Sequence, residues 1–324
     1  MDLSSFKGFF GGHRILVTGG AGFIGSWLCD ALVELGAKVV CLDNLSSGRV
    51  DNIKHLLNSG RFEFVNADVS SWCAGEGFDV IVHGASIPSP EDYMSRPVET
   101  LLSNSIGLLK LLENARENGS ILLYMSTSEV YGDAAIIPTP ETYYGYVNPI
   151  GLRSCYDESK RFGEALCMAY FRQYNVDVRI ARIFNSYGPR LDVNARYARV
   201  VPRFILQALR NEPITVHGDG RQTRSFTYIT DTVAALVMML AKDTVRGEVL
   251  NVGNPKETSI LELAEKIIKL TGSSSKIVFT EPRPDDPRRR CPDIRRAKEL
   301  IGWEPKVQLE EGLKYTIEWF RKCV

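Results

Sequence analysis

The sequence predicts an α/β protein: a doubly wound parallel sheet, followed by a smaller C-terminal α/β lobe. Two observations predict it. Strand and helix patterns alternate over more than half of the 324 residues, and the first strand passes through a glycine-rich turn into a helix. Strands interleaved with helices need right-handed crossovers, which make the strands parallel and cover both faces of the sheet. The length is enough for about two lobes with a large buried core.

The predicted elements follow from apolar runs and periodicity. Strands are expected at 14–18, 38–42, 62–66, 79–83, 121–126 and 178–183, with helices at 23–35, 98–117 and 157–174. Beyond Gly188-Pro189 the pattern changes to helices at 200–211, 230–242, 259–271 and 310–322. We therefore expect a sheet domain over residues 1–185, including the catalytic helix. Residues 186–324 mainly form a substrate-binding lobe over the carboxyl edge of the sheet, and some of their segments are free to return to the sheet.

The first strand leads into three spaced glycines. Gly19 permits a sharp turn, Gly22 lets backbone N–H groups approach a diphosphate, and Gly25 lets the next helix pack closely on the strand. The positive end of that helix would hold the diphosphate. We assign Phe23 and Ile24, the first residues of the helix, to the same cofactor site. Together these features indicate a Rossmann-type dinucleotide-binding domain.

The second strand ends in Asp43, at the position expected for the acid that binds the adenosine ribose. A lone aspartate here could equally be a strand-end turn or cap, but the full strand–turn–helix–strand context favours a nucleotide. Because a carboxylate repels a 2′-phosphate, NAD is preferred over NADP. Arg49 lies close enough in sequence to keep NADP open. The neighbouring Asn44 is assigned to the same site.

Further cofactor residues are expected where other strands end, because open α/β sheets bind ligands there. Asp68 could accept a hydrogen bond from the adenine amino group, with Val69 beside it, and Gly84 and Ala85 leave room for a cofactor. Asn104 in the helix at 98–117 completes the set. Two structural alternatives stay open: Asp68 as a helix cap, and His83 as a satisfied core histidine.

A candidate acid–base pair opens the helix at 157–174. Tyr156 and Lys160 are four residues apart and share a helical face. A tyrosine has an ordinary pKa of about 10. The Lys160 ammonium and a positively charged nicotinamide would favour the phenolate, which could then take a proton from a sugar hydroxyl. On spacing alone, an ordinary surface Tyr–Lys pair is the better interpretation.

The motifs together change that interpretation. T-G-G-A-G-F-I-G (18–25), H-G-A-S (83–86), S-T-S-E-V-Y-G (126–132) and Y-D-E-S-K (156–160) resemble the extended short-chain dehydrogenase/reductases that modify nucleotide sugars. The resemblance covers nearly the whole chain and continues in R-I-F-N-S-Y-G-P-R (182–190), Q-T-R-S-F-T-Y (222–228), D-P-R-R-R (286–290) and L-I-G-W-E-P (300–305).

The resemblance implies roles for individual residues. Tyr156 would be the catalytic base, Lys160 would bind the nicotinamide ribose, and Ser126 would lie in the core of the active site. The nucleotide-sugar substrate would be held by Asn185, Arg190, Gln222, Arg224 and Arg290. Arginine forks match phosphate oxygens, and side-chain amides match the edges of uracil or thymine.

Ser128 and Glu129 narrow the resemblance. The 4-epimerases of this family usually carry small residues there, and the 4,6-dehydratases carry Asp-Glu. Ser-Glu, together with the run at 147–161, resembles the UDP-glucuronate decarboxylases. Such enzymes oxidise C4 of UDP-glucuronate with tightly held NAD⁺, lose CO₂ from the resulting β-keto acid and reduce C4 again, forming UDP-xylose. Ser128 and Glu129 would orient or protonate the intermediate, and Arg290 would position the carboxylate.

Other functions stay open at this point. A UDP-glucose 4-epimerase needs only the steps at C4, and a dTDP-glucose 4,6-dehydratase-like enzyme is a related alternative. A non-catalytic NAD-binding regulator is a third class. Such regulators typically lose the Tyr-x-x-x-Lys pair, and this chain keeps Tyr156 and Lys160.

Composition excludes several partners. The 39 basic and 39 acidic residues cancel, so no overall charge favours nucleic acid or a membrane surface. The longest apolar runs are too short to span a membrane, and residues 1–12 do not resemble a signal peptide, so a cytoplasmic protein is expected. The cysteines are scattered without a C-x-x-C pair and the histidines lack ligand spacing, so no metal is expected.

A homodimer is expected from the helices at 98–117 and 157–174. They carry more apolar residues than one buried stripe requires: Leu101, Leu102, Ile106, Leu108, Leu109, Leu111 and Leu112 in the first, Phe162, Leu166, Met168, Ala169 and Phe171 in the second. In the resembling family these helices form a four-helix dimer core with two-fold symmetry. The alternative is that the C-terminal lobe covers them.

Overall fold

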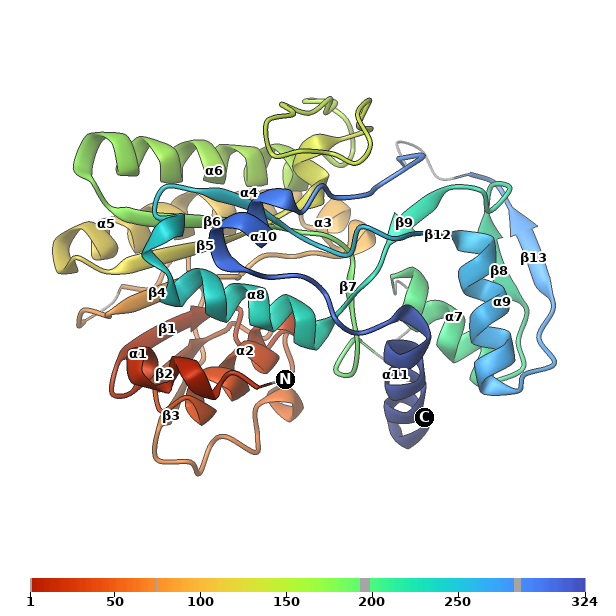
Figure 1. The fold of residues 1–324 in the computed structure, drawn as a ribbon, viewed down its shortest axis with the longest axis horizontal. Coiled ribbons are helices and arrows are strands. Elements are labelled where there is room, and N and C mark those ends of the chain that lie inside the picture. Colours follow the sequence, from red (N-terminus) through yellow and green to blue (C-terminus); the bar gives the residue numbers. More distant parts are fainter. Residues whose placement is uncertain (1, 74, 193–198, 283–286, 324) are drawn as a thin grey trace.

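The computed structural model describes residues 2–73, 75–192, 199–282 and 287–323. Asp286, the first residue of the D-P-R-R-R motif, lies outside these ranges. The core is a seven-stranded parallel sheet in the order β11-β6-β5-β4-β1-β2-β3 (Figure 1). Its strands are β1 (Arg14–Thr18), β2 (Lys38–Leu42), β3 (Phe62–Val65), β4 (Val80–His83), β5 (Ile121–Thr127), β6 (Asp177–Ile183) and β11 (Val249–Val252). The predicted fold class is confirmed, and the first six strands lie where the sequence predicts them.

The strand order places β1 between β2 and β4, so successive connections leave β1 in opposite directions. This is the switch point of a doubly wound sheet, where a crevice opens beyond the carboxyl ends of the strands. The glycine-rich turn follows β1 and is therefore located at this crevice.

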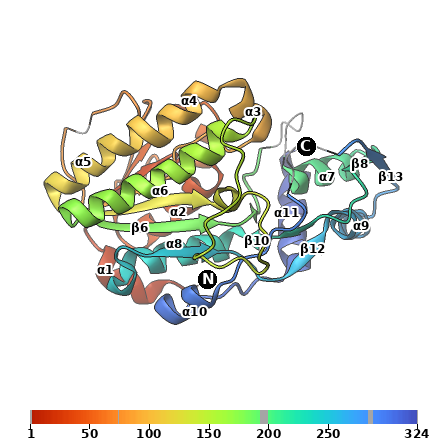
Figure 2. The ribbon, with the colours of Figure 1, turned by 90° about the horizontal axis from the view of Figure 1, so that it is seen from above.

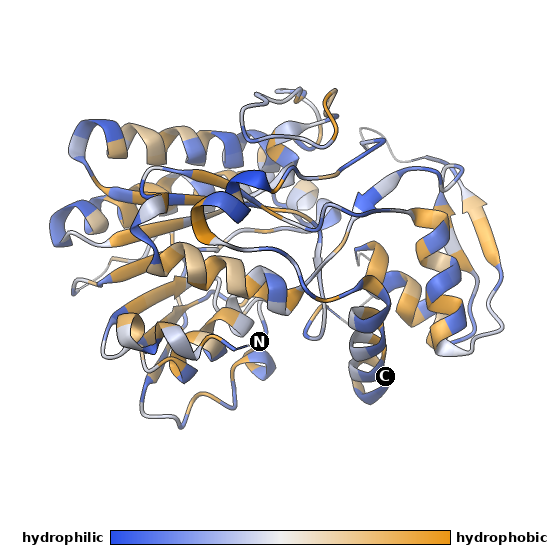
Figure 3. Cartoon of the chain, in the orientation of Figure 1, coloured by the Kyte–Doolittle hydropathy of each residue, from blue (hydrophilic) through white to orange (hydrophobic). Residues whose placement is uncertain are grey.

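The strands are rich in hydrophobic residues (Figure 3), and these are buried on both faces of the sheet because helices cover both faces. Ile15 and Val17 join the core formed with α2 (Phe23–Glu34) and α8 (Ile229–Ala241). Leu16 points the other way, into the core formed with α5 (Leu108–Asn118) and α6 (Ser154–Tyr174). The period of two along a strand produces this alternation.

The predicted helix at 98–117 is one helical stretch with an irregular centre. It comprises α4 (Pro97–Leu102), a π-helical segment (Ser103–Gly107) and α5. The sequence does not predict the π-helical segment. Short helices α1 (Lys7–Phe10), α3 (Pro90–Ser95) and α10 (Arg295–Ile301) are also additions to the predicted set.

The C-terminal lobe is built on three mutually packed helices, α7 (Val200–Leu209), α9 (Ile260–Thr271) and α11 (Leu309–Cys323). Three short strand pairs accompany them: β8 (Ile214–His217) with β13 (Ile277–Thr280), β9 (Thr223–Ser225) with β12 (Glu257–Ser259), and β7 (Ser186–Tyr187) with β10 (Thr227–Tyr228). Segments beyond residue 186 also return to the first domain, since β11 pairs with β6 and α8 packs on α2.

The outer face of α4, α5 and α6 lies on the opposite side of the molecule from this lobe (Figure 2). Apolar side chains are exposed there: Val98, Leu101, Leu102, Ile106, Leu109 and Phe162. Leu108, Leu111 and Leu112 are buried against the sheet instead. The alternative that the C-terminal lobe covers these helices is therefore wrong.

Candidate active site

A cleft of about 1790 Å³ opens where the carboxyl ends of the strands meet the C-terminal lobe. It brings together almost every residue that the sequence analysis assigns to a site. Those that line it are Gly19, Gly22, Phe23, Ile24, Gly25, Asp43, Asn44, Asp68, Val69, Gly84, Ala85, Ser126, Ser128, Glu129, Tyr156, Lys160, Asn185, Arg190, Gln222, Arg224 and Arg290. Asn104 is the exception.

The glycine turn cannot accept side chains. Gly19 has a φ of +72°, and a Cβ there would lie 2.8 Å from the Gly84 carbonyl group. A Cβ on Gly25 would collide with the backbone oxygen of Gly19. Gly22 caps the N-terminus of α2, which begins at Phe23. The bare backbone and the helix end together fit the diphosphate of a dinucleotide.

Asp43 is held rigidly at the edge of this turn. Its Oδ2 accepts a hydrogen bond from the Ala21 N–H at 3.0 Å, and its Oδ1 accepts one from Leu45 at 2.8 Å. Burial raises the pKa of Asp43, while these two bonds oppose the rise. Gly48 faces the carboxylate so closely that a Cβ on it would lie 2.7 Å from either oxygen. This is a fixed acceptor of the kind that binds ribose hydroxyls.

Asn44 and Asp68 are joined at the same end of the cleft, with Asn44 Nδ2 donating to Asp68 Oδ2 at 2.7 Å. The other Asp68 oxygen accepts from the backbone and the hydroxyl of Ser70. Despite partial burial, these bonds lower the pKa of Asp68. Asp68 therefore caps its own turn and also faces the cleft, so the two interpretations of this residue are compatible.

Asn104 lies beneath the cleft wall. Its side-chain amide donates to Ser86 Oγ at 3.0 Å, to Ser159 Oγ at 3.1 Å and to the Thr100 carbonyl at 3.0 Å. It thus ties the loop after β4 to helix α6. In this structure Asn104 supports residues of the cleft rather than lining it.

His83 is a satisfied core histidine. The Thr18 hydroxyl accepts from the N–H groups of Gly84 and Ala85, so its own proton is directed to His83 Nδ1, 2.8 Å away. His83 Nε2 then donates to the Ser103 carbonyl at 3.2 Å. Burial, reinforced by Lys160, lowers the pKa of His83 to about 3, which keeps the ring neutral.

Tyr156 lies in the cleft with its ring stacked on Tyr93. Burial raises the pKa of Tyr156 to about 12, against the opposing effects of Arg199 and a hydrogen bond with Thr127. Lys160 donates to the Met125 carbonyl at 2.9 Å, and burial lowers its own pKa to about 7. The surroundings of Tyr156 in this structure therefore favour its protonated, neutral form.

Ser128 and Glu129 begin a 3₁₀ turn (Ser128–Tyr131) directly after β5. Arg290 Nη1 lies 3.0 Å from Glu129 Oε1 and donates to Ser128 Oγ at 3.2 Å. Arg153 binds the other carboxylate oxygen of Glu129. Burial would raise the pKa of Glu129, but these arginines hold it below its usual value. The cleft thus contains a carboxylate between two guanidinium groups, which favour its ionised form.

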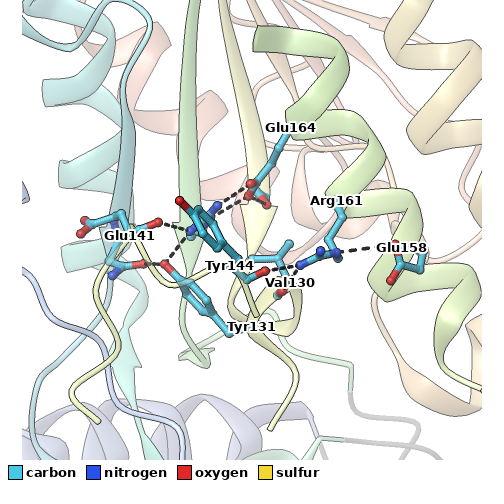
Figure 4. Close-up of polar contacts among 10 residues, drawn as sticks. Val130, Tyr131, Glu141, Tyr144, Glu158, Arg161 and Glu164 are labelled. Carbon is cyan, nitrogen blue, oxygen red and sulfur yellow. Dashed lines mark hydrogen bonds and ion pairs between the residues drawn. The ribbon is translucent and has the colours of Figure 1, made fainter. Parts of the chain in front are cut away.

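Ser126 donates to Glu164 Oε1 at 2.6 Å, so its lone pairs are left to face the cleft. Glu164 also binds Arg182 in two places, at 2.9 and 2.6 Å. Arg182 continues to the Tyr131 hydroxyl at 2.8 Å and to the Glu141 carbonyl at 3.0 Å (Figure 4). This network of hydrogen bonds and ion pairs holds the end of β5 in place beside the cleft.

Arg161 of α6 adds a second support for the same turn. Its Nη1 donates to the carbonyls of Val130 at 2.9 Å and Tyr144 at 2.6 Å, and its Nε lies 3.5 Å from Glu158 (Figure 4). Helix α6, which carries Tyr156 and Lys160, is thereby tied to the turn that carries Glu129.

The C-terminal lobe contributes the far wall of the cleft. Gln222 donates to the His217 carbonyl at 2.7 Å, and Arg224 donates to the Thr223 carbonyl at 2.8 Å. The side-chain nitrogen of Asn185 is buried and has no hydrogen-bond partner among the described residues. Buried donors are rarely left unpaired, so a ligand in the cleft would satisfy it.

Arg190 packs against helix α2. It binds Asp30 of α2 at 2.7 Å, and its guanidinium stacks 4.7 Å above the centre of the Trp27 ring. Both partners belong to the helix that follows the glycine turn.

Three residues around Tyr156 are not among the predicted site residues: Tyr93, Arg153 and Asp157. Arg153 stands three residues before Tyr156 inside the run used for the family resemblance, so its position was visible in the sequence. Nothing in the sequence pointed to Tyr93, because only the packing of α3 against α6 brings it to Tyr156.

Within residues 2–73, 75–192, 199–282 and 287–323, the side chains form no cluster suited to a metal ion. Over the same ranges, every helix is too short or too polar to cross a bilayer.

Sequence comparison identifies related families. The sequence model of the NAD dependent epimerase/dehydratase family matches residues 15–253. UDP-glucuronic acid decarboxylase 1 of Xenopus tropicalis is 50% identical over 309 residues, which cover 95% of this chain and 72% of that protein. UDP-glucuronic acid decarboxylase 4 of Arabidopsis thaliana is 48% identical over 311 residues, covering 96% and 69% of the two chains.

Solved structures agree in fold. An epimerase from Methanothermobacter thermautotrophicus superposes with a TM-score of 0.90 at 32% identity, over 98% of this chain and 95% of that one. The UDP-glucuronic acid 4-epimerase of Bacillus cereus, in complex with UDP-glucuronic acid and NAD, gives a TM-score of 0.86 at 30% identity, over 96% and 100% of the two chains.

Proposed function

Since this chain belongs to the NAD dependent epimerase/dehydratase family, we propose that it is a UDP-glucuronate decarboxylase that forms UDP-xylose. Relatives named as UDP-glucuronic acid decarboxylases match it at 48–50% identity over about 95% of its length, which supports this activity.

One structural observation carries the proposal. Ser128, Glu129 and Arg290 form a bonded group in the same cleft as Tyr156. The group offers a cation for the sugar carboxylate and an ionised carboxylate beside it. The sugar of UDP-glucose has no carboxylate, so this group favours UDP-glucuronate over UDP-glucose as the substrate.

The cleft fits NAD through its glycine turn and Asp43. Gly19, Gly22 and Gly25 expose backbone to the diphosphate, Asp43 binds the adenosine ribose, and Asn44 and Asp68 lie at the adenine end. Arg190, held beside the same helix by Asp30 and Trp27, also lines the cleft. When bound, NAD⁺ supplies reversible hydride transfer at C4 of the sugar.

The residues of the chain supply the proton chemistry and the positioning. Tyr156 takes the proton of the sugar C4 hydroxyl and later returns it, while Lys160 binds the nicotinamide ribose. The bond from C5 to the carboxylate breaks to release CO₂, and the enolate that remains takes up one proton at C5 from water. Ser126 accepts a hydrogen bond from that part of the substrate, because its own proton is committed to Glu164. Arg290 and Ser128 orient the sugar carboxylate, and Glu129 holds Arg290 in place.

The nucleoside diphosphate lies against the C-terminal lobe. Arg224 matches its phosphate oxygens, and Gln222 and Asn185 offer amide groups to the nucleoside and the sugar. Asn185 has an unpaired buried nitrogen among the described residues, which a substrate oxygen would satisfy.

A 4-epimerase is the second candidate, and the fold supports it through the similarity to the Bacillus cereus enzyme. One experiment separates the candidates. The purified protein is incubated with UDP-glucuronate, and the release of CO₂ and a UDP-pentose is measured. UDP-galacturonate without CO₂, or UDP-galactose formed from UDP-glucose, would identify an epimerase instead. Binding of NAD without turnover of either sugar would favour a regulator.

We further infer a homodimer built on α4, α5 and α6, because this face exposes apolar side chains. Two-fold pairing of two helical faces would form a four-helix core.

A cytoplasmic location is supported by the seven cysteines, all of which are free.

A further inference from the structure

Asp157 is a buried carboxyl group next to the proposed catalytic tyrosine. It lies in the first turn of α6 and is 7% exposed, but it does not line the cleft. Its Oδ2 is 3.7 Å from Arg153 Nε. Its Oδ1 is buried and has no hydrogen-bond partner among the described residues. Among the described residues, the ion pair with Arg153 is therefore the main polar contact of this side chain.

Arg153 links this carboxyl group to the substrate site. The same guanidinium that faces Asp157 binds Oε2 of Glu129, whose Oε1 lies 3.0 Å from Arg290. Arg290 in turn donates to Ser128 Oγ. Acidic and basic side chains thus alternate from Asp157 through Arg153 and Glu129 to Arg290. Only the last three line the cleft, so Asp157 acts on the substrate through Arg153.

We propose that Asp157 is a positioning residue, which holds Arg153 in the orientation that fixes Glu129 and Arg290 against the sugar carboxylate. This inference rests on the proposed function, because the role of Glu129 and Arg290 comes from it. The geometry behind it does not depend on that function, since the ion pairs join residues of the chain itself.

The surroundings of Asp157 also make it responsive to pH. It is faced by Glu129 from the 3₁₀ turn, Arg153 and Arg290, and Tyr93 from α3; on its own helix its neighbours are Cys155, Tyr156 and Glu158. Burial, then Glu129, raises the pKa of Asp157 to about 7, although Arg153 and Arg290 oppose the rise.

The two carboxyl groups that share Arg153 therefore differ in charge near neutral pH. Glu129 stays ionised because its pKa is lowered. Asp157 is neutral below about pH 7 and ionised above it. In its ionised form it holds Arg153 through their ion pair, and in its neutral form it loses this hold on Arg153. The position of the Glu129 carboxylate should therefore change as the pH passes through the pKa of Asp157.

The test compares Asp157→Asn and Asp157→Ala with the wild type, using CO₂ release from UDP-glucuronate between pH 5.5 and 8.5. Glu158→Gln is the matched control, because it removes the adjacent carboxylate of the same helix, which pairs with Arg161 instead. We expect an inflection near pH 7 in kcat for the wild type and for Glu158→Gln, and its loss in Asp157→Asn. Asp157→Ala should lower kcat by roughly 10- to 100-fold, the cost of misplacing a group near the reacting atoms, with a smaller change in KM.

The inference is overturned if Asp157→Asn keeps the wild-type pH profile, or if Asp157→Ala has wild-type kcat. Failure of the proposed function looks different, since the wild type itself would then release no CO₂. A crystal structure of Asp157→Ala keeps the inference testable in that case. Arg153 should leave Glu129 in that structure, and an unmoved Arg153–Glu129 pair would contradict the positioning role.

Discussion

The ring of Tyr93 lies parallel to the ring of Tyr156, with the centroids 5.1 Å apart and the planes inclined by 5°. Tyr93 is only 1% exposed and comes from α3, so this stack is part of the protein core. The position of the Tyr156 ring is therefore set by packing, while its hydroxyl remains available for chemistry. Removing the hydroxyl should leave the ring in place.

Because the ring should stay in place, Tyr156→Phe tests the hydroxyl of the proposed base alone. Turnover of UDP-glucuronate should fall by roughly 10²–10⁴-fold, the usual contribution of a general acid–base group. Bound NAD, measured after denaturing the purified protein, should stay at the wild-type level because the stack and the cofactor wall are unchanged. A variant with full activity would remove Tyr156 from the mechanism.

Glu129→Gln should affect both activity and stability. It removes the anion between Arg153 and Arg290, and Arg290 is only 4% exposed. CO₂ release should slow, and the free energy of unfolding should fall by about 3 kcal/mol, the cost of leaving a buried charge without its partner. Glu257→Gln is the control, because its partner Arg289 is 55% exposed and such pairs contribute less than about 1 kcal/mol. Equal denaturation midpoints for the two variants would contradict the prediction.

Asp43→Asn tests cofactor choice. Without the carboxylate, the affinity for NAD should fall and the discrimination against NADP should weaken, because the charge that repels a 2′-phosphate is gone. Gly48→Ala should weaken NAD binding by pressing on the same carboxylate. Asp51→Asn changes an exposed acid paired with Arg49 and Lys54 and serves as the control. The dissociation constants of both cofactors, measured by calorimetry, decide the outcome; an unchanged NAD to NADP ratio in Asp43→Asn would refute it.

Leu109→Asp tests the proposed dimer. Leu109 is exposed on the outer face of α5, where a charge would have to be buried on association. Sedimentation should show a dimer for the wild type and a monomer for the variant. Phe279→Asp, an exposed apolar position on β13 in the C-terminal lobe, should remain dimeric. A monomeric wild type, or a dimeric Leu109→Asp, would exclude this interface.

Asp157 also predicts how stability depends on pH. Its pKa is about 7 in the folded chain and 3.8 when unperturbed. Between these values the folded state holds a proton that the unfolded state has released, so this group lowers stability as pH rises from about 4 to about 7. Asp157→Asn cannot ionise. The difference in melting temperature, variant minus wild type, should therefore increase across this window and level off above it, and a flat difference would be evidence against the raised pKa.

The features that the sequence determined are local ones. The β1–turn–α2 unit is encoded by an apolar run, three spaced glycines and a helical period, all within residues 15–35. The shared face of Tyr156 and Lys160 follows from the pitch of one helix. Because strands in a doubly wound sheet end at a common edge, the positions of Asp43, Asp68 and Gly84 also follow from the order of strands and helices.

The tertiary structure alone decided the contacts between segments that are far apart in the chain. Arg290 reaches Glu129, Tyr93 stacks on Tyr156, and β11 returns to pair with β6. Asn104 is placed beneath the cleft and Arg190 against α2 in the same way. No local period encodes these pairs, because each depends on how whole helices and strands pack around a shared core. The same packing removes water from Asp157 and Glu129 and surrounds them with unequal numbers of cations, which is why two carboxyl groups of similar intrinsic acidity come to differ in charge.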